Sequence, residues 1–274
     1  TTLTISGHNN HFSQLSGSIP PEIGNLVNLE YLNLSVNHNL SGEIPSELGN
    51  LTKLQYIDLE YNDLSGDIPW SAILQMEDLQ HLDLGPGNNF TGEIPSEIDN
   101  LTDLEYLSLE QMSLTGQLPA EVGNLINLEY LSLSRNSFTG EIPSSFVNLT
   151  NLEQIRLDQN QFSGTIPSYF GNLYNSNGNV AHTYLDFSYN NFTGIVPNSF
   201  CALLESPCGY CYGVDLDHNN LCGFPSCFTA DDVPADINDQ DDSNCADCPE
   251  GQIAADGVNC YDQSDLNALS AIAD

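Results

Sequence analysis

The chain has 274 residues, of which 38 are aspartate or glutamate and only three are lysine or arginine, so its formal net charge at pH 7 is −35. Such a surface repels phosphate groups, which excludes nucleic acid and anionic membrane surfaces as partners. The sequence contains no apolar run as long as the 18 residues that a membrane span needs, so we expect no transmembrane segment.

A short apolar motif followed by a glycine and a proline recurs nine times along the chain. Residues 54–69 read LQYIDLEYNDLSGDIP, and residues 104–119 read LEYLSLEQMSLTGQLP. Equivalent leucines of six successive motifs are separated by 25, 25, 25, 24 and 24 residues: Leu34, Leu59, Leu84, Leu109, Leu133 and Leu157. A period of this length predicts a solenoid, in which each turn buries its apolar face against the next turn.

Each turn of such a solenoid contributes one short strand to a common face. We expect these parallel strands at about residues 3–5, 32–34, 57–59, 82–84, 107–109, 131–133, 155–157, 185–187 and 214–216. Because neighbouring strands lie about 4.8 Å apart, the face should be roughly 40 Å long.

The full pattern, L-x-x-L-x-L-x-x-N-x-L-x-G-x-I-P, resembles the plant-type leucine-rich repeats of receptor-kinase ectodomains and polygalacturonase-inhibiting proteins. The resemblance implies a leucine-rich-repeat solenoid with an α/β-type repeat and about nine repeats over residues 1–227. Parallel strands should line its concave face, short helical or 3₁₀ turns its convex face, and a disulfide-rich cap its C-terminal end. It implies no particular ligand, because one fold serves many functions.

Asparagines occupy one position of the motif in several repeats: Asn62, Asn136, Asn160, Asn190 and Asn219. The resemblance implies that their side-chain amides satisfy backbone groups at the turn between layers, since buried backbone groups need partners. Met112 stands at this position in one repeat. We therefore expect the ladder of amides to be interrupted there.

Between the buried leucines, alternate strand residues should point out of the concave face. One outward column reads Tyr31, Tyr56, His81, Tyr106, Tyr130, Gln154 and Tyr184, and its six aromatic members are the candidate binding residues. Its neighbours read Glu30, Gln55, Gln80, Glu105, Glu129 and Glu153, and a second outward column reads Asn33, Asp58, Asp83, Ser108, Ser132, Arg156, Asp186 and Asp215. Two interpretations stay open: a strip that binds protein or sugar, or a cross-strand ladder that only stabilises the sheet.

All eight cysteines lie beyond residue 200, in an acidic, loop-rich end of the chain, which predicts disulfides rather than a metal site. The passage NNLCGFPSC, residues 219–227, resembles the cysteine cap of plant-type repeat ectodomains, and this resemblance implies a bond between Cys222 and Cys227. The other six allow 15 connectivities, among which the sequence does not choose: Cys201, Cys208, Cys211, Cys245, Cys248 and Cys260.

The acidic, cysteine-containing tail, residues 228–274, has a composition typical of disorder. Its stretch DDVPADINDQDD lacks the glycine and the final glutamate of a regular calcium loop, since Asp241 and Asp247 stand at those positions. Loose calcium binding to this acidic stretch is left open, and no other cofactor is expected.

Seven N-x-S/T sequons predict N-linked glycans: Asn33, Asn39, Asn50, Asn89, Asn100, Asn148 and Asn191. Together with the cysteines they favour an extracellular or cell-surface location. The chain starts with TTLTISG, inside a repeat strand, so we expect that a signal peptide has been removed.

No nucleophile elbow, phosphate loop or metalloprotease motif occurs, so we expect no enzyme. The leading hypothesis is an extracellular structural and protein-interaction scaffold, whose uncapped residues 1–5 are covered by the C-terminal cap region of an identical neighbour, which builds a filament head to tail. The alternative is a secreted ligand-binding module, either a receptor ectodomain or an enzyme inhibitor. Ice binding has a precedent in the family, but the sequence shows no flat threonine array.

Overall fold

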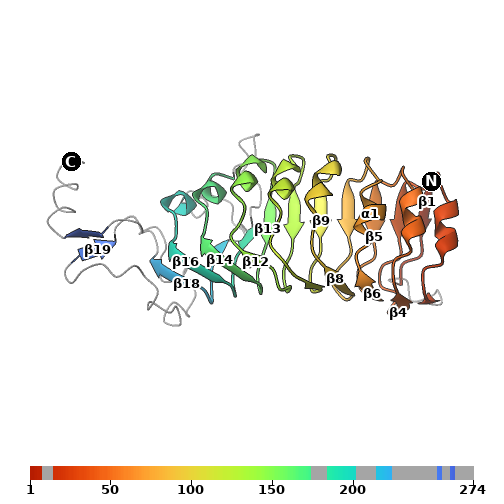
Figure 1. Ribbon diagram of the computed structural model, residues 1–274, viewed down its shortest axis with the longest axis horizontal. Helices are drawn as coiled ribbons and strands as arrows, with labels where there is room; N and C mark the ends of the chain where they lie inside the picture. Colours follow the sequence, from red (N-terminus) through yellow and green to blue (C-terminus); the bar gives the residue numbers. More distant parts are fainter. Residues whose placement is uncertain (8–14, 174–183, 202–213, 224–251, 255–259, 263–274) are drawn as a thin grey trace.

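The computed structural model describes residues 1–7, 15–173, 184–201, 214–223, 252–254 and 260–262. Within these residues the chain winds into an elongated solenoid in which a face strand, a flank strand and a short helical turn recur (Figure 1). This arrangement confirms the predicted leucine-rich-repeat solenoid with parallel strands. The predicted division at residue 227 falls outside the described residues and stays a prediction.

The face strands form one parallel sheet in strict chain order. Its nine strands are β1 (Thr2–Thr4), β3 (Tyr31–Asn33), β5 (Tyr56–Asp58), β7 (His81–Asp83), β9 (Tyr106–Ser108), β11 (Tyr130–Ser132), β13 (Gln154–Arg156), β15 (Tyr184–Asp186) and β17 (Val214–Asp215). Eight of them begin one residue earlier than the sequence predicts, and β17 begins where predicted. We call the outward side of this sheet the concave face.

The middle residue of each central strand points into the solenoid and is fully buried. Leu82, Leu107 and Leu131 each have 0% of their surface exposed, and the register places them side by side on neighbouring strands. Burying one leucine side chain contributes about 2 kcal/mol. Because the same position is apolar in every turn, each turn covers the apolar face of the next one.

A second set of short parallel strands runs along the flank of the solenoid, which the sequence analysis did not predict. One sheet contains β2 (Ser16–Gly17), β4 (Asn39–Gly42), β6 (Asp63–Asp67), β8 (Asn89–Gly92) and β10 (Ser113–Leu114), and another contains β12 (Thr139–Gly140), β14 (Gln161–Thr165), β16 (Asn191–Ile195) and β18 (Asn220–Gly223). Farther along the chain, β19 (Gln252–Ala254) pairs antiparallel with β20 (Cys260–Asp262).

Short helical turns return the chain to the next face strand, as predicted. They are η1 (Pro21–Asn25), η2 (Ser46–Asn50), the α-helical turn α1 (Trp70–Ile73), η3 (Ser96–Asn100), η4 (Ala120–Asn124), η5 (Ser144–Asn148), η6 (Ser168–Asn172) and η7 (Asn198–Phe200). A proline in an extended conformation precedes a typical turn, and its carbonyl accepts the first bond, as from Leu48 N to Pro45 O at 3.0 Å. Neighbouring turns lie close together, since a Cβ on Gly123 would come within 2.5 Å of Ser145.

The asparagines form the predicted ladder. In one example, Asn160 Nδ2 donates to the carbonyls of Leu133 and Leu157 at 2.9 and 3.1 Å, and Asn160 Oδ1 accepts from Phe138 N at 3.0 Å. Asn62, Asn136, Asn190 and Asn219 make equivalent bonds. Asn37 and Asn88, which the sequence analysis left out, also belong to the ladder. Met112 is buried and carries no amide, so the ladder is interrupted there as predicted.

Candidate functional site

Five aromatic side chains form a continuous stack across the concave face. We call Tyr31, Tyr56, His81, Tyr106 and Tyr130 the aromatic column. Strand register places each ring opposite the next, and successive ring centroids lie 4.0, 4.1, 4.1 and 4.3 Å apart with interplanar angles of 10, 8, 15 and 4°. Five of the six predicted binding residues are therefore brought together.

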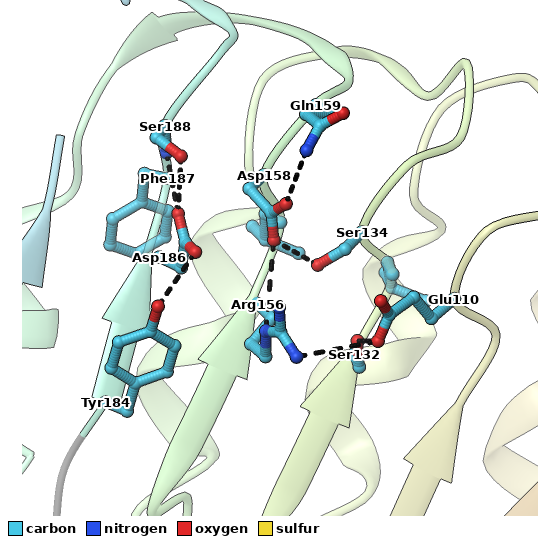
Figure 2. Close-up of polar contacts among 12 residues, drawn as sticks. Glu110, Ser132, Ser134, Arg156, Asp158, Gln159, Tyr184, Asp186, Phe187 and Ser188 are labelled. Carbon is cyan, nitrogen blue, oxygen red and sulfur yellow. Dashed lines mark hydrogen bonds and ion pairs between the residues drawn. The ribbon is translucent and has the colours of Figure 1, made fainter. Parts of the chain in front are cut away.

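The sixth predicted residue, Tyr184, lies apart from this stack. Gln154 stands between it and Tyr130 in the register of the sheet. The Tyr184 hydroxyl donates a hydrogen bond to Asp186 Oδ2 at 3.0 Å (Figure 2). Tyr184 therefore belongs to a polar region rather than to the aromatic column.

The stacking decides what the aromatic column offers to a ligand. Tyr56, His81 and Tyr106 each have another ring against both faces. Their ring edges and polar atoms are what remains for a partner. A sugar ring that stacks on an aromatic face would reach only the outer faces of the two end rings. The column has the geometry of a stabilising cross-strand ladder, and its role in binding stays a prediction.

A groove of about 490 Å³ follows the aromatic column on the concave face. Its walls are the first four rings of the column together with Thr2, Glu30, Gln55, Gln80 and Glu105. Glu30, Gln55, Gln80 and Glu105 each precede a face strand, and backbone carbonyls at this position anchor the next repeat. In one example, Gln80 O accepts from Glu105 N at 2.8 Å and from Tyr106 N at 3.0 Å. Hydrogen-bonding side chains thus lie beside ring edges along the whole groove.

The second column, predicted to point outward, is mostly buried, which corrects the sequence analysis. Asp58 and Asp83 are each 7% exposed, and Ser132 is 0% exposed. The reason is local crowding, since residues 4.8 Å apart in parallel strands cover one another. Asp58 Oδ2 accepts from Asn33 Nδ2 at 2.6 Å, and Asp83 accepts from Gly85 N at 3.1 Å and from the Tyr106 hydroxyl at 3.3 Å.

Burial shifts the pKa values of two side chains in this part of the face, Asp83 and His81. Burial, followed by repulsion from Glu60 and Asp58, raises the pKa of the Asp83 carboxyl to about 8. Burial within the stack lowers the pKa of His81 to about 4. The aromatic column therefore holds a neutral imidazole at neutral pH, and Asp83 retains its proton there for much of the time.

Around β13 the polar groups of the concave face surround a cation instead (Figure 2). Arg156 Nη1 lies 3.5 Å from Glu110 Oε2, and Arg156 Nε lies 3.9 Å from Asp158 Oδ1. Ser132 and Ser134 donate hydroxyl hydrogen bonds to the same two carboxylates. Burial opposes the charge on Arg156, but Glu110 and Asp158 outweigh it and raise the pKa of the guanidinium. We call these five residues the Arg156 network.

The predicted modification sites fall into two groups. Six sequon asparagines are exposed: Asn39, Asn50, Asn89, Asn100, Asn148 and Asn191. Asn33 is half-buried, and its amide is bonded to Asp58 and to Ser35.

Cys201 is disulfide-bonded. The pairing of Cys222 with Cys227 stays a prediction, because residue 227 lies outside the described residues, as do Cys208, Cys211, Cys245 and Cys248 and the acidic stretch around Asp241.

Two features are absent from the described residues, a membrane-spanning helix and a metal-binding cluster. None of their helices has the length and apolar character needed to cross a membrane. The same part of the chain contains no cluster of three or more histidine, cysteine or carboxylate side chains arranged to hold a metal ion.

Comparison with known proteins identifies the repeats. A family model described as "Leucine-rich repeat region" matches residues 10–115 and 95–175, and one described as "Leucine Rich Repeat" matches residues 183–203. Among curated proteins, none matches the chain.

Solved structures similar to the chain include receptor ectodomains. The ectodomain of the plant membrane receptor kinase GASSHO1/SCHENGEN3 from Arabidopsis thaliana, in complex with CASPARIAN STRIP INTEGRITY FACTOR 2, is 32% identical with a TM-score of 0.71, over 82% of this chain and 25% of that one. The Arabidopsis receptor kinase HAESA ectodomain, in complex with an extended IDA peptide hormone ligand, is 33% identical with a TM-score of 0.66, over 80% and 34%. This chain thus spans about a quarter to a third of their length.

A plant ice-binding protein is also similar, at 28% identity and a TM-score of 0.64, over 81% of this chain and 73% of that one. The repeat models together match well over half of the sequence, and the described strands and turns repeat with the same period. The protein therefore belongs to the leucine-rich-repeat family, and its repeats are of the plant type.

Proposed function

We propose that the protein is a non-enzymatic, extracellular glycoprotein that recognises a protein or peptide partner on its concave face. The observation that carries the proposal is the groove of about 490 Å³ along the aromatic column. Ring edges, a neutral histidine and amide side chains line it, and such mixed apolar and polar surfaces are typical of binding sites. The printed descriptions of two similar ectodomains name a protein factor and a peptide hormone as their ligands.

The other parts of the proposal rest on the sequence and on exposure. Six exposed sequons provide sites for N-linked glycans, and oxidised cysteines suit an extracellular protein. Asn33 is the exception, because its amide is already bonded between neighbouring strands. We therefore expect glycans at some of the exposed sites and none at Asn33, which keeps the groove accessible. Peptide mass mapping before and after glycosidase treatment measures this.

The test of concave-face recognition uses two pairs of tyrosines. Peptide ligands are first selected from a random display library with the native chain as bait. We expect the double variant Tyr106→Ala, Tyr130→Ala to lose these ligands. The control Tyr61→Ala, Tyr189→Ala removes two tyrosines that are 44% and 50% exposed outside the aromatic column, and it should keep them. Equal binding by both variants would contradict the proposal.

Head-to-tail association of copies stays a prediction and is not needed for recognition. Sedimentation of the native material measures it directly. A single monomeric species at high concentration would remove the filament from the proposal and leave the concave-face site intact.

A further inference from the structure

Three glutamates continue the polar wall of the groove, the first within its lining and the other two beyond it. We call Glu105, Glu129 and Glu153 the glutamate row. Each immediately precedes a face strand, and the register of β9, β11 and β13 places them on successive strands. Carboxylates at this position therefore recur about every 4.8 Å along the solenoid axis. Glu105 and Glu129 are exposed, and Glu153 is half-buried.

No described cation neutralises the glutamate row. The ion pairs among the described residues involve Glu30, Glu110 and Asp158, and none includes a member of the row. Arg156, the one arginine or lysine in the described face strands, is held by the Arg156 network. Burial, together with repulsion from Glu153 and Glu105, raises the pKa of Glu129. Unlike most exposed acids, these three thus have like-charged neighbours fixed beside them by the sheet.

The glutamate row and the groove form one continuous surface. Glu105 lines the groove together with Gln80, His81 and Tyr106, and Tyr130, the last ring of the aromatic column, follows Glu129 in the chain. A partner lying along the ring edges therefore passes directly beside the three carboxylates. Two side chains on the same side of an extended segment are about 7 Å apart, and the row spans about 10 Å, so two alternate basic residues reach it.

We infer that the groove and the glutamate row bind an extended basic segment of a protein partner, with lysine or arginine at alternate positions facing Glu105, Glu129 and Glu153. The inference rests on the proposed concave-face function and adds the charge of the partner. Charge complementarity selects this occupant, because the three carboxylates of the glutamate row take part in none of the ion pairs among the described residues.

A basic peptide is attracted to any surface of a chain with a net charge of −35, so the experiment compares two equally charged variants. The concave variant is Glu105→Gln, Glu129→Gln. The matched control is Glu47→Gln, Glu97→Gln, which removes two exposed glutamates from the 3₁₀ turns η2 and η3. The probe is a fluorescent 12-residue peptide of alternating lysine and serine, measured by anisotropy at about 0.15 M salt. Peptides with glutamate or glutamine in place of lysine are the reference probes.

We expect the concave variant to bind the lysine peptide about tenfold more weakly than the native chain, and the control variant to lose less than twofold. Zero-length carbodiimide cross-links from the peptide should map to Glu105, Glu129 and Glu153. An equal loss in both variants, or cross-links spread over Glu47 and Glu97 as well, would show attraction by net charge alone and would overturn the inference.

The library experiment separates this inference from the proposed function. Selected ligands that need Tyr106 and Tyr130 but carry no basic residues would refute the basic segment and leave concave-face recognition standing. Selected ligands whose binding does not depend on Tyr106 and Tyr130 would refute both the basic segment and concave-face recognition.

Discussion

The two halves of the concave face have the same backbone but hold their polar groups differently. From β3 to β11 the outward positions stack five rings, and burial and two neighbouring acids raise the pKa of Asp83 beside them. The stack ends at Gln154 in β13, where Arg156 lies beside the carboxylates of Glu110 and Asp158 (Figure 2). The repeated apolar motif therefore determines where the strands form. The residue types at the outward positions determine whether the concave face carries a groove or a network of ion pairs and hydrogen bonds.

The asparagine ladder divides the same halves. It is continuous from Asn136 to Asn219 beneath the Arg156 network, and Met112 interrupts it beneath the aromatic column. In the half that carries the groove, one repeat thus lacks the side-chain amide that joins the layers elsewhere. Less hydrogen bonding between layers is typical of regions that open more readily.

The largest expected effect comes from breaking the continuous half of the ladder. Asn160→Ala leaves Phe138 N without its acceptor. It also removes one of the two amide donors to each of Leu133 O and Leu157 O, which keep the amides of Asn136 and Asn190. Since a buried backbone group without a partner costs about 1–3 kcal/mol and two further hydrogen bonds are lost, we expect the free energy of unfolding to fall by about 3 kcal/mol in urea titrations. The exposed neighbour Gln159→Ala should change it by less than about 0.5 kcal/mol. Similar losses in both variants would contradict the ladder's role.

The second test removes the cation that distinguishes the two halves. Arg156→Met leaves Asp158 and Glu110 without their counter-ion, with side chains only 5% and 14% exposed. We expect a loss of about 2 kcal/mol at pH 8, less than for a fully buried pair, because the Arg156 side chain is 30% exposed. The loss should shrink at pH 5, because burial raises the pKa of Asp158 and favours its protonation. Arg135→Met, at an exposed position, is the control.

The third test removes a buried acid from the aromatic half. The pKa of Asp83 is raised to about 8, so the folded chain holds a proton that the unfolded chain releases above about pH 4. The stability from this proton is complete below pH 4 and is lost as the pH rises through 8. Asp83→Asn should therefore raise the free energy of unfolding by about 1 kcal/mol at pH 8 and leave it unchanged at pH 4. A gain that does not depend on pH would point to another cause.

The smallest expected effect concerns the stack itself. A double-mutant cycle of Tyr106→Ala with Tyr130→Ala should give a coupling energy of about 0.5–1 kcal/mol, since their rings stack at 4.3 Å. The cycle of Tyr130→Ala with Gln154→Ala crosses the boundary between the halves and should give less than half of that. Equal coupling energies in the two cycles would mean that the interaction between neighbouring strands is no weaker at Gln154 than within the stack.

Much of this fold could be predicted because the apolar period is regular. Face strands were placed to within one residue, and Met112 was identified as the break in the ladder. The flank strands were missed because their sequences contain glycines and few β-branched residues, so local propensity does not indicate a strand. Gly66, for example, has a φ of +89° and belongs to β6 only because a neighbouring turn pairs with it.

The candidate site was predictable in outline and not in detail. The alternation of residues along the strands correctly predicted five rings in one column, but it also predicted that Asp58 and Asp83 would be exposed. A period of two predicts the face of the sheet to which a side chain points, and not how much of that side chain is exposed. Exposure depends on how closely the neighbouring strands cover a side chain, which no single repeat encodes. The Arg156 network joins residues from three repeats, Glu110, Ser134 and Arg156, and no motif within one repeat could have revealed it.

The most direct test of the central claim is hydroxyl-radical footprinting of tyrosines with and without a library-selected peptide. The chain supplies its own reference, because Tyr61 and Tyr189 are exposed outside the aromatic column. We predict that bound peptide slows oxidation of Tyr31, Tyr56, Tyr106 and Tyr130 and leaves Tyr61 and Tyr189 unchanged. Protection of Tyr61 and Tyr189, with the aromatic column oxidised as before, would contradict recognition on the concave face.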